Sequence, residues 1–549
     1  MDKYVMDIVK KHTPLMNEKV VRGYTTYKIK EAPAYLDHIF RWAFENMNSV
    51  CQLTYDGFEI ATPKEEFEEA SKPRATKRSV NVGKSTIYMV KFYFTYKGEP
   101  LPPRFVYLPY CEEGNIFYLS GTRYFLFPVL ANKIISATSD GLFVKMLKDK
   151  KIFVREYINV YVNSQVKHTY YVKSVLFDAT QRRKKMPDTT NCSPTNMHYI
   201  LAKYGLNNFF MKFHGFIPEI HTYTEFGINP DNKYDLNDYF DLSKVDIIES
   251  LRIKPRNYKD QYYYPTDIFF VVPKEYMDEN VLTSIGTIIY ILDNFPDKIR
   301  KEDMGKAFPW LRTLGYINFT SAYDNAQLVE KMNEHFDSLE ETMNEFIVNK
   351  LAQIGYDCHD IYDLLYYLKR DFAQWYSCSD VISSMYGKEL DVLYSTLSHM
   401  VHAIFKAVYD IKKKVNNQKE LSKSEINEIL VKRVRTGMIF DLSKNTAGTR
   451  SNMSTLSYSG DNMFFKITST IIPQEGNHGG KGKGKVKLDD PNNKLHASYA
   501  EAGGYLAITK PAPIGNGKIN PFVTLDDEGT IIPSDDLKDV VINTQDKLT

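Results

Sequence analysis

Apolar and polar residues alternate through most of the first third of the chain. The alternation is clearest at 87–94 and 114–121, where many residues are also β-branched or aromatic, as is typical of strands. It continues to about Leu176 and predicts a β-rich region. Nearer the N-terminus the pattern predicts a short helix at 6–11, a strand at 50–55, and an exposed loop or short helix at 63–77.

Helical spacing replaces this alternation further along the chain. It predicts helices at 191–205 and 281–292, and helices dominate from 321 to about 414. One of them carries apolar residues three or four positions apart, at Val329, Met332, Phe336 and Leu339.

Another helix is predicted at 422–434, where Ser422 as N-cap and Glu425 three residues later match a capping box. After Gly437 short strands are separated by Gly, Asn, Ser and Thr, and a Gly/Lys loop lies at 479–487. A chain of 549 residues is too long for one compact core, so the predicted fold class is multi-domain α+β.

Composition narrows the class of protein. Hydrophobic content of 43% and charged content of 25% are those of an ordinary folded chain. No stretch reaches the roughly 20 apolar residues that span a bilayer, and the N-terminus lacks an apolar signal core. The five cysteines include no CxxC pair, which argues against a zinc ribbon or a disulfide framework. We therefore expect a soluble protein of a reducing, intracellular compartment.

The net charge of +2 hides an uneven distribution. Residues 431–520 hold 13 Lys/Arg and 6 Asp/Glu, a local net charge of +7, whereas residues 521–549 hold 2 basic and 7 acidic residues, a net of −5. A basic segment followed by an acidic one suits one face for phosphates and another for a protein partner, although ordinary variation along a surface gives the same pattern.

Two motifs suggest a self-contained active site and do not hold. Gly83-Lys84-Ser85-Thr86 matches the end of a phosphate-binding loop, but the earlier glycine is replaced by Arg78 and the segment leads into a predicted strand. Asp526-Asp527-Glu528 alternate sides on an extended chain, so a solvated turn before Gly529 is expected rather than a metal site. Two basic runs, 182–185 and 481–487, remain open between phosphate contact and solvated loop.

Three stretches, taken together and in order, resemble the β-type subunit of multisubunit RNA polymerases. The first, 105–123, resembles the family's strand and Gly-aromatic-hydrophobic hairpin, with Gly121 at the tight turn; Ser120 replaces the usual Asn and Arg123 the usual Glu. The second combines 434–437 with the Ser-Thr-Leu-Ser run at 454–457. The family follows this run with two arginines, where this chain has 458–461, and Lys466 or Arg450 offers a replacement charge.

The third stretch begins at Leu495-His496 and continues through 508–520. It is similar to the family's Leu/His start and its Thr-Pro-Glu-Gly core, with Pro511, Gly517, Ile519 and Asn520 in register. Ala512-Pro513 replaces the Glu-Gly step, so the contacts of that step are not carried over. The chain stops near the middle of an ordinary β-type subunit, which resembles the split subunits of giant (jumbo) bacteriophage polymerases.

The resemblance implies an architecture and a role. Residues 1–155 and 391–436 would form a β-rich protrusion-like domain, 156–390 an inserted mixed α/β lobe-like domain, and 437–549 a fork-like segment lining the active-site cleft. The chain would carry no catalytic residue and bind no cofactor, because Mg²⁺ would be held by another subunit. The residues expected to face phosphates are Arg435, Lys444, Arg450, Lys481, Lys483, Lys485, Lys510 and Lys518.

The expected partners follow from the same resemblance. They are the C-terminal half of the β-type subunit, the halves of the β′-type subunit, a promoter-specificity subunit, template DNA and RNA, and no membrane. The host bacterial cytoplasm is the expected location, and the sequence leaves open whether the polymerase is also packaged in the virion. Two alternatives stay in view: a phage structural or scaffolding protein, and a stand-alone NTP-using enzyme built on Gly83-Lys84.

Overall fold

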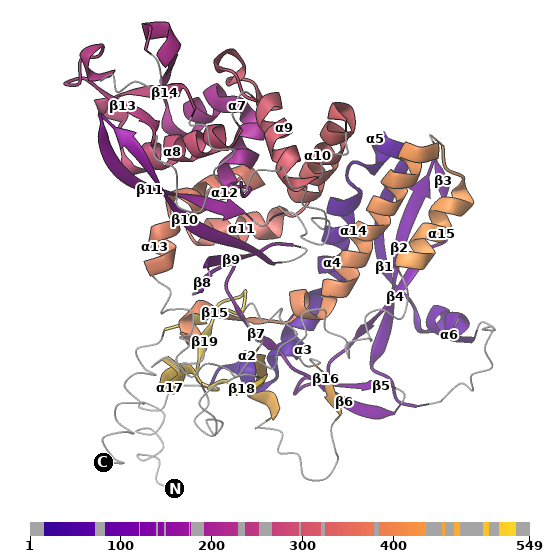
Figure 1. The fold of residues 1–549 in the computed structure, drawn as a ribbon. Helices are drawn as coiled ribbons and strands as arrows, with labels where there is room; N and C mark the ends of the chain where they lie inside the picture. Colours follow the sequence, from indigo (N-terminus) through magenta and orange to yellow (C-terminus); the bar gives the residue numbers. More distant parts are fainter. Residues whose placement is uncertain are drawn as a thin grey trace, which may run out of the picture. The chain divides into compact units, whose positions relative to one another are not determined.

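The computed structural model describes residues 16–71, 83–119, 121–138, 141–147, 150–174, 176, 192–228, 236–251, 266–295, 298–319, 324–377, 384–418, 420–434, 453–455, 466–472, 498–503 and 515–533. The chain divides into two compact units (Figure 1). The first comprises 1–133 and 380–549, and the second is the continuous segment 134–379. The second unit is therefore an insertion into the first.

The boundaries of the insertion differ from the predicted ones. They fall at 133/134 and 379/380, whereas the resemblance placed them at 155/156 and 390/391. The first predicted boundary cuts through β10 (Lys150–Val162), which pairs with both its sequence neighbours, β9 (Gly141–Lys145) and β11 (Gln165–Ser174). The names protrusion, lobe and fork remain predictions for these units.

The larger sheet of the first unit is antiparallel and covered by helices. Strand β2 (Ile87–Tyr96) pairs with β1 (Leu53–Ile60), β3 (Glu99–Pro100) and β4 (Arg104–Pro109). Helix α4 (Ala32–Phe44) lies against β1, and α14 (Leu393–Gln418) lies against α4 (Figure 1). The other helices of this unit are α2 (Glu18–Val21), α3 (Tyr24–Lys28), α5 (Met47–Cys51), α6 (Pro63–Ser71), α15 (Lys423–Arg433) and α17 (Ser498–Ala502).

Aromatic packing holds α4 on this sheet. Phe40 is fully buried, and its ring centroid lies 4.6 Å from that of Phe92 and 5.7 Å from that of Phe94 on β2. Burying such a side chain contributes about 1.5–3 kcal/mol, whereas the helix propensity of Phe differs from that of Ala by under about 1 kcal/mol. Packing therefore determines the position of α4 more than local preference does.

Among its described residues, the first unit has three further, small sheets. One has the order β16-β6-β5, from Met453–Thr455, Thr122–Leu126 and Ile116–Leu119. Another has the order β15-β7-β17-β18, from Lys388–Asp391, Val129–Asn132, Ser469–Ile472 and Gly515–Lys518. The third is a pair, β19 (Thr524–Leu525) and β20 (Ile531–Ile532). Each of the first two joins segments that are hundreds of residues apart in the sequence.

The second unit is built on a seven-stranded sheet with helices around it. Its order is β12-β14-β13-β10-β9-β8, and β11 also pairs with β10. The remaining strands are β8 (Ile135–Thr138), β12 (Glu219–Thr222), β13 (Val245–Ser250) and β14 (Ile268–Pro273). The helices are α7 (Asn196–His214), α8 (Glu279–Asn294), α9 (Ala307–Asn318), α10 (Asn325–Glu340), α11 (Glu345–Gln353), α12 (Ile361–Arg370) and α13 (Phe372–Ser377).

Helix α8 packs directly on the β10–β11 hairpin. Gly286 allows this close approach, because a Cβ there would lie 2.7 Å from Thr169 Cγ2 and 3.6 Å from the side chains of Ile158 and Val160. Thr169 Oγ1 also donates to Thr283 Oγ1 over 3.1 Å. One face of the hairpin therefore packs against α8 and forms part of the core.

The prediction of an α+β chain is confirmed, as are most of its long elements. The strand at 87–94 is β2 and the helix at 281–292 is α8. The helix predicted at 191–205 corresponds to the first part of α7, which begins at Asn196, has a kink at Gly205 with a φ of 71°, and resumes to His214. The segment at 63–77 begins with a short helix, α6. The predicted helix at 6–11 and most of the segment after Gly437 lie outside the described residues.

The predicted strand at 50–55 is wrong in its first half. Helix α5 runs through Cys51 and ends at Gln52, whose φ of 57° places it in the left-handed region. Strand β1 begins only at Leu53. A single left-handed residue thus separates two elements that alternation had merged.

The cysteine and membrane expectations are tested within the described part of the chain. Cys51, Cys111, Cys192 and Cys358 are all free thiols. Burial raises the pKa of Cys111, Cys192 and Cys358 to about 12, which leaves these thiols unreactive. Among the described residues no helix has the length and apolar character to cross a membrane.

Candidate nucleic-acid interface

The three stretches that resemble the polymerase β-type subunit come together in the first unit. The first stretch forms β4, β5 and β6, and its Gly121 has a φ of +82° at the β5–β6 turn. The second forms β16, which pairs with β6 through Met453↔Leu126 and Thr455↔Tyr124. The third ends in β18, which pairs with β17 from Ser469↔Lys518 to Ile472↔Gly515.

The β5–β6 hairpin is anchored on helix α3. Asn115, just before β5, has a φ of 61°, and its side-chain oxygen accepts from the backbone N–H of Thr26 over 3.1 Å. The Thr26 hydroxyl in turn accepts from the Asn115 N–H over 3.0 Å. Gly23 permits this contact, because a Cβ there would lie 2.4 Å from Asn115 Oδ1. The hairpin is therefore held in one orientation at its base.

Hydrogen bonds join residues 498–503 to residues 515–533, and join the latter to the rest of the first unit. The Ile519 N–H donates to Thr468 O and the Asn520 N–H to Ala502 O, each over 2.8 Å. The Asn520 side chain donates to Glu501 O over 2.8 Å. At the other end of the segment Leu390 N–H donates to Gly529 O over 2.7 Å. Sequence positions in register with the family, Ile519 and Asn520, are thus structural anchors here.

Lys518 is the one predicted phosphate-facing residue that the structure describes. It lies half-buried on β18, and its ammonium group donates to Ser469 Oγ on β17. Burial lowers the pKa of Lys518, and the charge of Lys466 lowers it further. Arg435, Lys444, Arg450, Lys481, Lys483, Lys485 and Lys510 lie outside the described residues.

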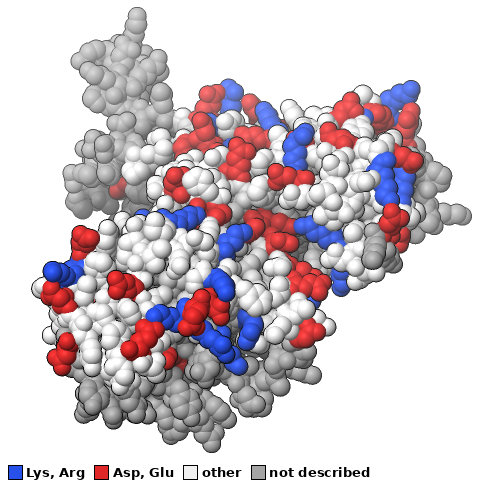
Figure 2. All heavy atoms as spheres, turned by 90° about the horizontal axis from the view of Figure 1, so that it is seen from above, with Lys and Arg blue, Asp and Glu red and all other residues white. Residues whose placement is uncertain are grey.

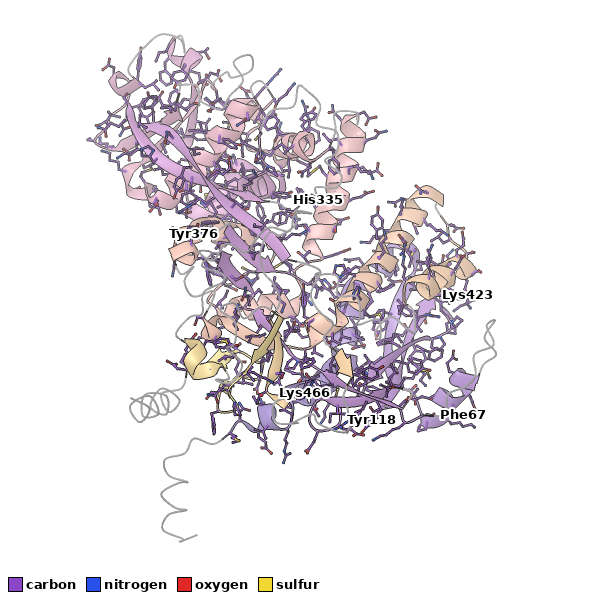
Figure 3. All side chains as sticks on the ribbon, turned by 60° about the horizontal axis from the view of Figure 1, so that its bottom comes forward. Phe67, Tyr118, His335, Tyr376, Lys423 and Lys466 are labelled. Carbon is purple, nitrogen blue, oxygen red and sulfur yellow. The ribbon has the colours of Figure 1, made fainter. Side chains whose placement is uncertain are left out.

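Lys466 lies near enough to Lys518 for its charge to lower the pKa of Lys518, and its role as a replacement for the missing arginine pair stays a prediction. Its ammonium group lies 6.0 Å from the ring centroid of Phe127, which follows β6. Figure 3 shows Lys466 and Tyr118 toward the same side of the first unit. An anion beside Lys518 would favour the charged form of this lysine. Ser469 was not singled out from the sequence, since only the sheet register brings it to Lys518.

The Gly83-Lys84 motif is not a nucleotide site. Residues 83–86 lead into strand β2 and not into a helix, as the sequence predicted. Lys84 lies 2.8 Å from Glu112 Oε1 and 4.0 Å from the ring centroid of Tyr118. The Tyr118 N–H donates to Thr86 Oγ1 over 2.6 Å. The motif thus ties the start of β2 to β5.

The acidic run before Gly529 forms the predicted turn. Asp527 and Glu528 are exposed, and Asp526 Oδ1 accepts from the Thr530 N–H over 2.7 Å. Across the described ranges no three His, Cys, Asp or Glu side chains are placed to hold a metal ion.

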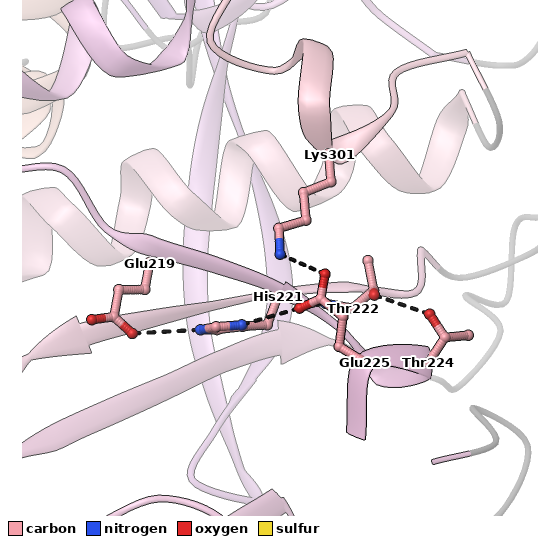
Figure 4. Close-up of polar contacts among 6 residues, drawn as sticks. All are labelled: Glu219, His221, Thr222, Thr224, Glu225 and Lys301. Atoms are coloured by element: carbon pink, nitrogen blue, oxygen red, sulfur yellow. Dashed lines mark hydrogen bonds and ion pairs between the residues drawn. The ribbon is translucent and has the colours of Figure 1, made fainter. Parts of the chain in front are cut away.

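A histidine between two glutamates in the second unit is also structural (Figure 4). His221 Nδ1 lies 3.2 Å from Glu225 Oε2 and its Nε2 lies 3.4 Å from Glu219 Oε2. Lys301 donates to the other oxygen of Glu225 over 2.5 Å, which holds the pKa of Glu225 at about 2. Glu225 closes the capping box of the short helix that begins after Thr222. The cluster therefore fixes a helix start, and its groups are already engaged with one another.

Surface charge is mixed on the face drawn in Figure 2. Lysine and arginine side chains lie among aspartates and glutamates, without a large area of one sign. The described part of that face therefore gives no broad basic surface for duplex DNA, and a nucleic-acid interface has to be sought in smaller groups of residues.

A family model described as non-virion RNA polymerase subunit matches residues 1–543. The chain therefore belongs to the non-virion RNA polymerase subunit family and is a subunit of an RNA polymerase, which implies a multisubunit complex that works on nucleic acid. No curated protein matches the chain. Family membership favours the polymerase expectation over both the scaffolding alternative and the stand-alone enzyme.

Proposed function

We propose that the chain is the N-terminal half of a split β-type subunit in the multisubunit RNA polymerase of a giant bacteriophage. One observation carries the proposal. Strand β6, in the hairpin of the first stretch, pairs with β16 of the second, and β18 of the third is linked through β17 to β7, the strand that follows β6. An accidental resemblance would have no reason to join the same segments in space.

In this proposal the chain supplies electrostatic and steric support for nucleotidyl transfer. Two metal ions held by another subunit perform the chemistry. The segment 437–549 lines the cleft, and its lysines and arginines neutralise phosphates of the DNA and of the RNA–DNA hybrid. Lys518 and Lys466 belong to that basic segment, and a phosphate beside them favours the charged form of Lys518. The chain itself binds no cofactor.

The partners follow from the same assignment. The C-terminal half of the β-type subunit and the two halves of the β′-type subunit complete the enzyme, and a promoter-specificity subunit directs it. The family's description as non-virion supports a polymerase that acts in the host cytoplasm and is not carried in the particle.

Charge reversal tests the cleft role. In the assembled polymerase, Lys481→Glu, Lys483→Glu and Lys485→Glu together should reduce transcription. Removing three phosphate contacts should also lower the slope of log K against log[salt] by roughly 3, because each contact contributes about 0.9. The measurements are elongation rate and DNA affinity across a salt series.

A matched variant reverses three exposed lysines outside the basic segment, Lys30, Lys64 and Lys274. It changes the net charge equally and should leave the salt slope as it is. Unchanged elongation of the 481/483/485 variant at every salt concentration would refute the cleft role.

A further inference from the structure

One face of the β10–β11 hairpin is buried at its inner end, where the Tyr170 hydroxyl donates to Lys369 O over 3.0 Å, and is open further out. Its antiparallel register sets Arg155 opposite Val172, Tyr157 opposite Tyr170, and Asn159 opposite His168. Paired residues of an antiparallel ladder lie on the same face of the sheet. The other face, with Thr169 and Tyr171, packs on α8. We call the face that carries Arg155, Tyr157, Asn159, His168 and Tyr170 the hairpin face.

Arg155 lies at the centre of a group of aromatic rings on this face. Its guanidinium carbon lies 4.8–5.6 Å from four ring centroids, those of Tyr157, Tyr170, Phe372 and Tyr376. The last two come from α13, and Figure 3 shows Tyr376 beside the long strands. Within the described residues no carboxylate forms an ion pair with Arg155. Its charge is held by rings, which leave its N–H groups able to bind an anion.

The outer part of the hairpin face is open. Tyr157 is 68% exposed, a large fraction for a tyrosine, and Asn159 and His168 are also exposed. His168 Nδ1 lies 2.5 Å from Asn159 Oδ1, so the two side chains are held side by side. The face thus presents a flat ring, a cation and a fixed polar pair to solvent.

The acidic residue of β10 is turned away from this face. Glu156 has the opposite orientation, where it bonds Tyr171 and Lys173. On the neighbouring strand β13, Glu249 pairs with Tyr161 and lies on the same face of the sheet, where it accepts from the Tyr223 hydroxyl. Neither β10 nor β11 places a carboxylate on the hairpin face. The positive charge of Arg155 beside the exposed Tyr157 ring therefore favours an anionic ligand with a flat group.

We propose that the hairpin face binds single-stranded nucleic acid, with a base stacked on Tyr157 and a phosphate at Arg155. An unpaired base offers the π-face that a tyrosine ring needs, whereas the bases of a duplex are stacked on each other. The inference rests on the chain being an RNA polymerase subunit, and it is independent of the β-type assignment and of the basic segment at 437–549. A displaced DNA strand and a transcript have the same chemistry here.

The test uses the assembled polymerase and two photoreactive probes, an oligothymidylate carrying 4-thiothymidine and an oligouridylate carrying 4-thiouridine. Cross-linked peptides are identified by mass spectrometry, and affinity is measured by anisotropy. The peptide of β10 should cross-link, and Tyr157→Ala should lower its yield and the affinity about 5- to 100-fold, the range for loss of one stacked base. Tyr157→Phe keeps the ring and should restore both.

Tyr239→Ala is the matched control, since Tyr239 is 50% exposed in the same unit and should behave as wild type. An effect with only one probe identifies the strand as DNA or RNA. Equal binding and cross-linking by wild type and Tyr157→Ala, or no cross-link at β10, overturns the inference. So does loss of a protein subunit from the Tyr157→Ala complex, because the face would then be a protein interface.

The outcome separates this inference from the cleft proposal. If Tyr157→Ala changes neither cross-linking nor affinity and the 481/483/485 variant lowers the salt slope, only the hairpin site is ruled out. If Tyr157→Ala lowers both and the 481/483/485 variant leaves elongation and the salt slope unchanged, only the cleft role is ruled out.

Discussion

Lys369 is a lysine fully enclosed in the second unit. Its ammonium group donates to Ser284 Oγ over 2.5 Å and to Asn280 O over 3.2 Å, and it lies 4.9 Å from the ring centroid of Tyr366. His214 Nε2 lies 3.0 Å from the same Ser284 hydroxyl. Burial lowers the pKa of Lys369 to about 7 and that of His214 to about 3. The network is satisfied by neutral oxygens rather than by a carboxylate.

Replacing Lys369 with methionine should change how the second unit responds to pH. Between pH 7 and about 10 the unfolded chain keeps a proton on Lys369 that the folded chain has released. The free energy of unfolding therefore rises with pH in this window, by at most about 1.4 kcal/mol per pH unit. Below pH 7 the folded and the unfolded chain both hold this proton, so Lys369 no longer makes the unfolding free energy depend on pH.

Hydrogen exchange in α12, corrected for intrinsic rates, measures the effect. Lys369→Met should remove the rise of the unfolding free energy with pH. Lys274→Met, at an exposed lysine of the same unit, should keep that rise. A Lys369→Met protein with the wild-type pH response would show that the proton is lost elsewhere.

The role of a residue could be predicted where its partner is close in the sequence, and could not where the partner is distant in the sequence. Ser422 caps α15 and Glu425 completes the capping box, as the sequence predicted, because all of its atoms lie within four residues. Neither Lys369 beside Ser284 nor Lys518 beside Ser469 has such a local signature. Their partners are brought close by sheet and helix packing, which one sequence does not display.

At the scale of elements, periodicity identified the long helices and strands but misplaced some of their details. In α10 the first buried residue of the apolar stripe is Leu328, whereas Val329, which the pattern favoured, is only partly buried. A shift of one residue turns the apolar stripe by about 100°, and neighbouring apolar residues allow either choice. The short strands β15 to β20 carried almost no periodic signal, since each has four residues or fewer.

Gly529 holds the β19–β20 pair against the first unit. It has a φ of +90°, and a Cβ there would lie 2.1 Å from the Tyr24 hydroxyl and 2.7 Å from Leu390 O. Gly529→Ala should therefore detach β19 and β20 from β15 and destabilise this contact by several kcal/mol, because both backbone strain and a clash act together. Faster hydrogen exchange in β15 and at 524–532 would report the loss.

Gly98→Ala provides the comparison. Gly98 has a φ of +77°, and nothing lies within 4 Å of a Cβ at that position. The variant carries the strain without the clash, so it should cost only about 1 kcal/mol. Equal effects of the two substitutions would mean that Tyr24 moves aside.

At the scale of the whole molecule, the domain assignment stays a prediction. The chain divides into two units at 133/134 and 379/380, and the resemblance implies domain limits at 155/156, 390/391 and 436/437. Boundaries follow the pairing of strands such as β9 with β10, and pairing depends on register rather than composition. Seven of the eight predicted phosphate-facing residues lie outside the described residues, so that part of the site stays a prediction.

Affinity purification of the tagged chain from infected cells tests its place in the assembly. It should co-purify with at least three other large chains, the proposed second half of the β-type subunit and the two β′-type halves. Mass spectrometry of purified virions should not detect it, in keeping with the family's description. Recovery of the chain with copies of itself alone, or as a virion protein, would contradict the proposed complex.

Asn17, just before α2, donates to Val523 O over 2.9 Å, and its N–H donates to Pro521 O over 2.7 Å. The two ends of this contact are 506 residues apart, and a ribosome adds on the order of 10 residues per second. The nascent N-terminal segment therefore waits for roughly a minute before its partner is made. The inserted unit is continuous and has all its strands well before that time. Translation thus favours an order in which the insertion folds first and the surrounding unit closes around its own beginning last.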